Sequence, residues 1–174
     1  MRTMIGSKQR SLVLTGLGMA IAMSALVAAP IDPAPPEPVL KTFKANFPEA
    51  KLTAVVREVE DGVSLYKATF TVGEVGWYAA IAADGTQIET GHYIPEKDVP
   101  EVAMKAIRKE AAGTVIVKIA RLEVTHDTLD GKVTKLPAPE TEYEAQLAKT
   151  GSLGYVSIAS DGSVVEPLEW EKQH

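Results

Sequence analysis

The first candidates for a chemical role in this sequence are three histidines that could bind a metal ion, His92, His126 and His174. A metal site needs at least one further ligand at helical or strand spacing, as in His-x-x-x-His. None of the three histidines has such a neighbour, and the chain contains no cysteine. The sequence therefore predicts ordinary surface histidines, with no bound metal ion and no cofactor.

Two acidic triplets could in principle form a catalytic pair. Asp-Gly-Thr at 84–86 and Asp-Gly-Ser at 161–163 have the form of an aspartic-protease dyad. Their flanks lack the apolar pattern of such enzymes, and Asp-Gly also occurs at 61–62 and 130–131. Hairpin turns explain all four pairs, since Gly accepts positive φ and Asp bonds its own backbone. No Gly-x-Ser-x-Gly, phosphate-loop or dinucleotide motif is present, so we expect a protein that is not an enzyme.

The Asp-Gly-Thr and Asp-Gly-Ser triplets belong to a stretch that occurs twice. Residues 66–89 recur without a gap as residues 143–166, 77 positions later, so that Tyr66 falls on Tyr143 and Ile81 on Ile158. An internal repeat of this size fixes the architecture. We expect two copies of one structural unit.

Each copy is expected to be one helix followed by an antiparallel meander of about four strands. Helices and strands are predicted by apolar spacing of 3.6 and of 2 residues, respectively. In the first copy the helix covers 37–47, and the strands cover 52–60, 65–72, 76–83 and 87–89. In the second copy a helix begins at Asp98, with Asp98 and Glu101 as a capping box, and the strands cover 114–125, 143–149, 155–160 and 164–169. The segment 90–97 is expected to be a connection. The segment 127–142 is expected to be a longer excursion, in which about a hairpin's extension with the Asp130-Gly131 turn is inserted.

The order of these motifs resembles that of a known family. A helix ending in Phe-Pro-Glu-Ala, a strand, and the pattern Y-x-A-x-F…Y-x-x-x-I-x-x-D-G-T, followed by the same again, is similar to the PepSY-like family, which includes the β-lactamase-inhibitor-protein-like periplasmic domains. The resemblance covers 39–170, as repeats at 39–97 and 98–170. It implies an α+β fold whose helices pack on one face of the sheet. The second helix departs from the pattern, with Ala111-Ala112-Gly113 in place of an aromatic-Pro pair.

The resemblance also implies a class of function. Relatives of this family occur in propeptides that restrain metalloproteases and in a β-lactamase inhibitor. An exported binding or inhibitory module is therefore implied. The resemblance does not identify a partner.

The first 29 residues have the layout of an export signal. A basic start precedes an apolar run from Leu12 to Val27, which is shorter than the ~20 residues of a spanning helix, and small residues follow at Ala28 and Ala29. The segment 30–38 holds five prolines and is expected to be an extended linker. We expect a periplasmic or secreted protein, or one tethered by its N-terminus if the signal stays uncleaved.

Net charge limits the classes of partner. The chain carries a formal net charge of −5. Without residues 1–29 it has 15 basic and 23 acidic side chains, which gives a net charge of −8. An acidic body repels phosphate backbones and anionic lipid. We therefore expect no nucleic-acid partner and no membrane contact beyond an N-terminal tether.

The best binding surface is the face of the sheet turned away from the helices. If Tyr66, Phe70 and Ile81 face the helices, the alternating residues face the other way. Both copies then place one tyrosine on a face of small and polar side chains. The binding residues proposed from the sequence are Lys67, Thr69, Tyr78, Glu144, Gln146 and Tyr155, with His92 and Tyr93 in the 90–97 connection. The simpler alternative is a solvated sheet face with two tolerated tyrosines.

Together these observations predict an exported, non-catalytic module. It would bind an unidentified protein or peptide and restrain an envelope enzyme such as a peptidase. The alternative is a structural or accessory envelope domain without inhibitory activity, tethered by an uncleaved N-terminal segment.

Overall fold

A computed structural model describes residues 34–172. The predicted export signal at 1–29 and the beginning of the Pro-rich segment lie outside the described residues. Among those that are described, no helix combines the length and apolar character needed to cross a membrane.

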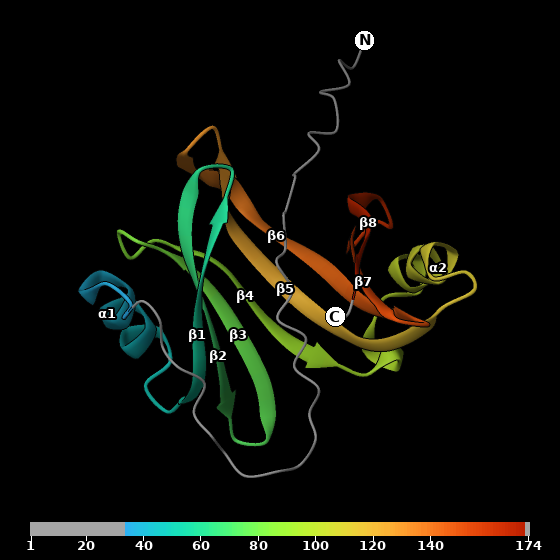
Figure 1. Cartoon of the computed structure of the whole chain (residues 1–174), viewed down its shortest axis with the longest axis horizontal. Helices are drawn as coiled ribbons and strands as arrows, with labels where there is room; N and C mark the ends of the chain where they lie inside the picture. Colours follow the sequence, from blue (N-terminus) through green and yellow to red (C-terminus); the bar gives the residue numbers. More distant parts are fainter. Residues whose placement is uncertain (1–33, 173–174) are drawn as a thin grey trace.

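The fold is α+β, as the duplication predicted. Two helices are each followed by four antiparallel strands, and all eight strands form one sheet in the order of the sequence (Figure 1). The first half comprises α1 (Glu37–Asn46), β1 (Lys51–Glu60), β2 (Val63–Val72), β3 (Val75–Ala82) and β4 (Gln87–Ile94). The second comprises the 3-10 turn η1 (Glu96–Asp98), α2 (Glu101–Glu110), β5 (Val115–Leu129), β6 (Lys132–Lys149), β7 (Ser152–Ala159) and β8 (Val164–Lys172).

The two halves match element by element. The starts of α1 and α2 are 64 positions apart, as are those of β1 and β5. The starts of β3 and β7 are 77 positions apart, as are those of β4 and β8. The 13 additional residues therefore lie where β5 runs into β6.

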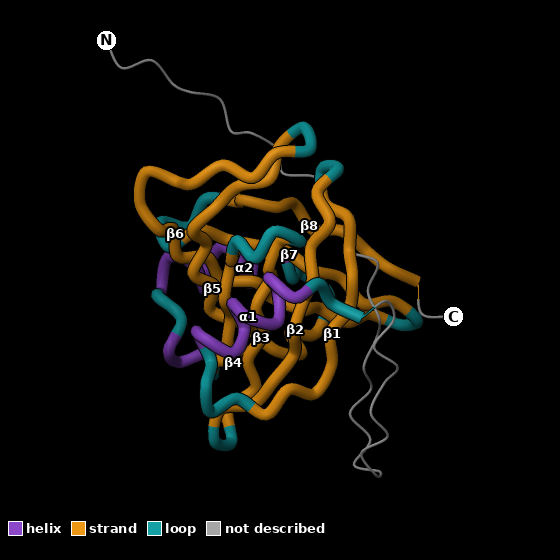
Figure 2. Tube along the Cα trace, turned by 90° about the vertical axis from the view of Figure 1, so that its left-hand side faces the viewer, coloured by secondary structure: helices purple, strands orange, loops and turns teal. Residues whose placement is uncertain are grey.

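Both helices pack on the same face of the sheet. Val39 and Phe43 of α1 lie against Phe70, which is fully buried, with the rings of Phe43 and Phe70 edge to face at 5.1 Å. Ile107 of α2 packs in the same way on Leu147 and its neighbours. Figure 2 shows α1 lying over the strands. The residues expected to face the helices, Tyr66, Ala68, Phe70, Trp77, Ala79 and Ile81, do pack against α1.

The repeat also reproduces the turn beneath each helix. A Cβ added at Gly85 would lie 3.0 Å from the Pro38 carbonyl oxygen, and one at Gly162 would lie 2.7 Å from the Val102 side chain. Both glycines have positive φ, 92° and 85°. Only glycine fits a turn that must bend this way while touching the helix.

The face opposite the helices, called the concave face below, is closed at one end. The β5–β6 hairpin bends over to meet the β1–β2 hairpin, and the Gly131 amide donates to the Asp61 carbonyl at 2.6 Å (Figure 1). Val133 of the extension packs on Val63 and Ile88. The additional residues of the second half thus cover apolar surface that the first half leaves on its sheet.

One local prediction was confirmed and two were wrong. The excursion at 127–142 is the expected hairpin extension, because its residues continue β5 and β6 as a paired hairpin with a two-residue turn at Asp130-Gly131. Segment 90–97 begins as strand β4, paired along its length with β5. Asp98 does not cap α2, because it belongs to η1, where its amide bonds the Pro95 carbonyl; Pro100 precedes the helix instead, without a side-chain cap.

Candidate functional site

The concave face gathers seven of the eight binding residues proposed from the sequence. Cross-strand pairs place them on one side of the sheet, because Thr69 lies opposite Tyr78 and Gln146 lies opposite Tyr155. The seven are Lys67 and Thr69 on β2, Tyr78 on β3, Tyr93 on β4, Glu144 and Gln146 on β6, and Tyr155 on β7. His92 points the other way, where it lies opposite Trp77 and stacks on its ring at 4.4 Å.

Tyr78 lies deeper in the molecule than an open sheet face would leave it. Its side chain is 7 % exposed and packs with Ala120, Leu122 and Val124. The ring crosses β4 at Gly91, where an added Cβ would lie 2.6 Å from Tyr78 Cζ. The Tyr78 hydroxyl is buried and has no hydrogen-bond partner among the described residues.

Two further tyrosines remain accessible at the open end of the concave face. Tyr93 is 40 % exposed and accepts a hydrogen bond from Lys118 Nζ at 2.7 Å. Tyr155 is half-buried and accepts a hydrogen bond from the Gln146 side chain. This end offers rigid aromatic area with polar tips, a combination typical of protein-binding surfaces.

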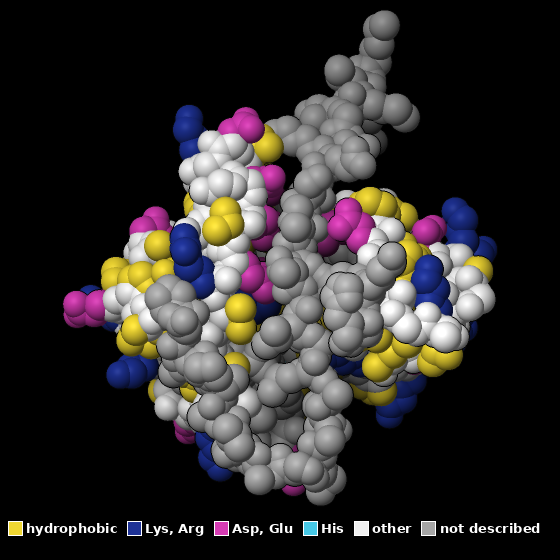
Figure 3. Space-filling view, viewed as in Figure 1, with side chains coloured by type: hydrophobic (Ala, Val, Ile, Leu, Met, Phe, Trp, Pro, Cys, Tyr) yellow, Lys and Arg dark blue, Asp and Glu magenta, His cyan; other side chains and the backbone are white. Residues whose placement is uncertain are grey.

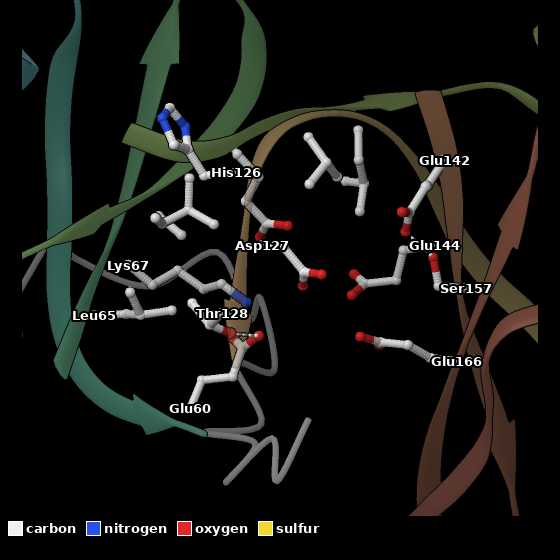
Figure 4. Close-up of a pocket in the computed structure, with 15 residues that line it drawn as sticks. Glu60, Leu65, Lys67, His126, Asp127, Thr128, Glu142, Glu144, Ser157 and Glu166 are labelled. Atoms are coloured by element: carbon white, nitrogen blue, oxygen red, sulfur yellow. Dashed lines mark hydrogen bonds between the residues drawn. The ribbon is translucent and has the colours of Figure 1, made fainter. Parts of the chain in front are cut away.

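Between the open and closed ends lies a small acidic cavity. Its volume is about 30 Å³. Lys67 extends into it from one side, and Glu144 and Glu166 face it from the other (Figure 4). The ionisable residues of its lining are Glu60, Lys67, Glu89, His126, Asp127, Glu142, Glu144 and Glu166. Figure 3 shows acidic side chains gathered towards the middle of the molecule, between the strands of the two halves.

Burial and crowding of like charges govern the titration of this cavity. Burial raises the pKa of Glu89 to about 7, although the ammonium of Lys67 opposes the shift. Burial, followed by the charge of Glu144, raises the pKa of Glu166 to about 8. Burial acts to lower the pKa of Lys67, but the charges of the surrounding carboxylates, of which Glu89 and Glu144 are the strongest, together outweigh it and hold that pKa well above its ordinary value.

Hydrogen bonds fix part of the cavity wall. Thr128 donates to Glu60 Oε1 at 2.8 Å, which joins the inserted hairpin to β1. The buried hydroxyl of Ser157 donates to Glu142 Oε2 at 2.9 Å. In the described part of the chain, no three His, Asp or Glu side chains come together in a way that could hold a metal ion.

The aspartates of the two acidic triplets, Asp84 and Asp161, have structural roles. Asp84 Oδ1 accepts the Thr86 amide at 2.8 Å, and Asp161 Oδ1 accepts the Ser163 amide at 2.9 Å. Each aspartate therefore closes its own turn, on the exposed surface. His126 lines the acidic cavity, where its Nδ1 lies 3.0 Å from Thr125 Oγ1.

Sequence reasoning missed most of the cavity. It selected Lys67 and Glu144 but left out Glu60, Glu89, Asp127, Glu142 and Glu166. One signal was available, since Glu89 and Glu166 end the two duplicated stretches and so occupy equivalent positions. Lys67 and Glu144 are equivalent in the same way, both 77 positions apart. Both Glu89 and its equivalent Glu166, and both Lys67 and its equivalent Glu144, therefore line the cavity.

Known structures share this fold. A BLIP-like protein from Bacteroides fragilis matches with a TM-score of 0.51 and 14% identity, over 80% of this chain and 89% of the other. A DUF2874 family protein from Bacteroides ovatus matches with a TM-score of 0.53 and 15% identity, over 79% and 87%. A candidate periplasmic protein from Bacteroides eggerthii matches with a TM-score of 0.54 and 13% identity, over 79% and 88%. No family model matches the chain, and no curated protein matches it. The resemblance inferred from the motifs is confirmed at the level of the fold.

Proposed function

We propose that this protein is an exported, non-catalytic module that binds a protein or peptide on its concave face. Restraint of an envelope enzyme, such as a peptidase, is the role we assign to that binding. The periplasm or the extracellular space is the proposed location, because residues 1–29 have the layout of an export signal.

The observation that carries the proposal is the composition of the concave face. Its open end presents Tyr93 and Tyr155, its centre holds the acidic cavity, and the buried Tyr78 hydroxyl has no partner among residues 34–172. Buried polar groups normally have partners within the protein or in water. A face that combines accessible tyrosines with an acidic hollow suits a ligand better than it suits bulk solvent.

The match to a BLIP-like protein adds support of a general kind. At 14% identity, the similarity between the two proteins is a similarity of fold, and the partner of this chain must be identified by experiment.

Capture from the envelope of the source cell, with variants matched across the sheet, tests the proposal. Tyr93→Ala removes an accessible side chain from the concave face, whereas His92→Ala changes the adjacent residue on the opposite face. We expect one envelope protein to bind the native protein and the His92 variant, and to be lost with the Tyr93 variant. Thermal unfolding should show that both variants remain folded.

Two results would speak against this function. Equal capture by all three proteins would mean that the concave face is ordinary surface. Loss of capture only with His92→Ala would move the site to the helix-bearing face. In either case a tethered accessory domain would become the better account.

A further inference from the structure

The sheet has two outer strands, and only one of them is protected against pairing with another chain. β8 contains Pro167, which cannot donate a backbone hydrogen bond, and its pairing with β7 is irregular at two places. β1 contains no proline and pairs with β2 in unbroken register from Ala54 to Glu60. In the sheet formed by residues 34–172, β2 is the only neighbour of β1. The outer edge of β1 is therefore a regular template for a further strand.

The duplication shows what such an edge accepts. β5 is the equivalent of β1, because the two strands start 64 positions apart and each has a bulge at the same place, between Leu52 and Ala54 in β1 and between Ile116 and Lys118 in β5. On the edge that β1 leaves free, residues 119–124 of β5 pair antiparallel with β4. The second half of the molecule thus fills with a strand the position that stays open beside β1.

The inserted hairpin limits the free edge at one end. Thr128 donates to the Glu60 side chain, and the Gly131 amide donates to the Asp61 carbonyl. The hairpin therefore occupies the space beyond Val59. A further strand can add along residues 54–59.

Side chains along this edge describe the strand that would fit. Val56 and Val59 are 38 % and 55 % exposed and lie on opposite faces of the sheet. On the concave side β1 also carries Glu58, where β5 has the apolar Leu122. An added strand therefore meets an apolar side chain on each face and one carboxylate, with which a basic residue directly opposite would pair.

A second copy of β1 fits this edge poorly. Two copies paired about a twofold axis in one continuous sheet place one residue opposite itself. Pairing centred on Arg57 sets like charges directly opposite each other, which destabilises a sheet. Pairing centred on Val56 leaves Glu58 opposite Ala54, without a positive group. A different, basic sequence suits the edge better.

We propose that β1 binds an extended segment of a partner polypeptide, which adds to the eight-stranded sheet as an antiparallel ninth strand along residues 54–59. Main-chain hydrogen bonds supply the affinity, and side chains opposite Val56, Glu58 and Val59 supply a preference for two apolar residues and one basic residue. Charge complementarity favours a basic segment, since the chain without residues 1–29 carries −8. The inference goes beyond the proposed function, because it concerns the sheet edge and does not depend on Tyr93 or Tyr155.

Amide hydrogen exchange of the ¹⁵N-labelled full-length protein, followed by nuclear magnetic resonance, tests the pairing. The probe is an end-blocked Val-Lys-Thr-Val-Thr-Thr peptide, whose first residue would lie opposite Val59 and whose lysine would lie opposite Glu58. We expect it to slow exchange at alternate amides of residues 54–59 by at least about tenfold. Two further peptides are N-methylated at odd or at even positions. One should retain binding and the other should lose it, because only every second amide of a strand faces its neighbour.

Charge exchange locates the lysine of the probe. Replacing that lysine with glutamate should weaken binding to the native protein about fivefold, and the Glu58→Lys variant should reverse the preference. Glu169→Lys changes an exposed carboxylate on the opposite outer strand, β8, and should alter the affinity of neither peptide. Tyr93→Ala, on the concave face away from β1, should also leave the affinity unchanged.

Several results would overturn the inference. No protection of residues 54–59 by the lysine peptide, or equal binding of the two N-methylated peptides, would exclude strand addition at β1. Loss of the peptide with Tyr93→Ala would move its binding to the concave face. A dimer of the protein alone that protects the same amides would assign the edge to a second copy. Failure of the peptide alongside Tyr93-dependent capture of an envelope protein would remove only the edge site and leave the proposed function standing.

Discussion

Replacing Glu166 with glutamine should stabilise the fold at alkaline pH. Burial and the charge of Glu144 raise the pKa of Glu166 from 4.5 to about 8 in the folded protein. A carboxyl group with a raised pKa binds its proton more tightly in the folded state than in the unfolded chain. Glu166 therefore does not reduce the stability of the fold below pH 4.5, where its carboxyl group is protonated in both states. It reduces stability progressively as the pH rises from there through 8.

The size of the effect follows from the shift. A rise in the pKa of Glu166 from 4.5 to about 8 lowers the free energy of unfolding by roughly 5 kcal/mol once the carboxyl group is fully ionised, because one pKa unit is worth about 1.4 kcal/mol. Glu166 is only partly buried, so water and the neighbouring groups reduce this to about 2–3 kcal/mol. Glu89, whose pKa is about 7, acts in the same direction.

Urea unfolding followed by tryptophan fluorescence, at about pH 5 and about pH 9, measures the difference. Wild type should lose stability towards the higher pH. The Glu166→Gln variant should lose less stability, so that it is more stable than wild type at the higher pH and equally stable at the lower pH. Glu169→Gln is the control, since its exposed side chain should have little effect at either pH. A wild type with constant stability across this window, or a Glu166 variant that is weaker at high pH, would refute the electrostatic account of the cavity.

Three further changes test the packing, each by urea unfolding. Gly91→Ala should cost about 1–3 kcal/mol, because its Cβ would lie 2.6 Å from Tyr78 Cζ and the ring must move; an unchanged midpoint would contradict that contact. Phe70→Ala should cost about 3–5 kcal/mol, since the side chain is fully buried under α1, and a loss below about 1 kcal/mol would be inconsistent with this core. Thr128→Val should cost about 1–3 kcal/mol by removing the donor to Glu60, and a neutral result would mean that this bond does not hold the inserted hairpin to β1.

The helix-bearing face could be predicted from the sequence because its determinants are local. Alternating apolar residues such as Phe70 and Ile81 assign a strand and its buried side at once. Asp-Gly pairs fix the turns between strands. The same alternation correctly placed Tyr78 and Tyr155 on the opposite face, in equivalent positions of the repeat.

The interior of the concave face could not be predicted in this way, because it depends on how far the sheet curves. Tyr78 and Tyr155 are equivalent in sequence, yet Tyr78 is buried beside Leu122 whereas Tyr155 stays half-exposed. Tyr78 packs with Ala120, Leu122 and Val124 of β5, and Leu136 of the inserted hairpin packs against this cluster. Glutamates at alternating strand positions look like solvent-facing residues until such a contact brings them together from distant strands.

Site-specific photo-crosslinking in the envelope of living source cells tests the central claim most directly. A photoreactive amino acid would be placed at position 155 on the concave face and, separately, at position 105, where Lys105 is exposed on α2. The account predicts a discrete crosslinked polypeptide from position 155 and none of the same size from position 105. The same product from both positions, or a product from position 105 alone, would contradict a binding function for the concave face.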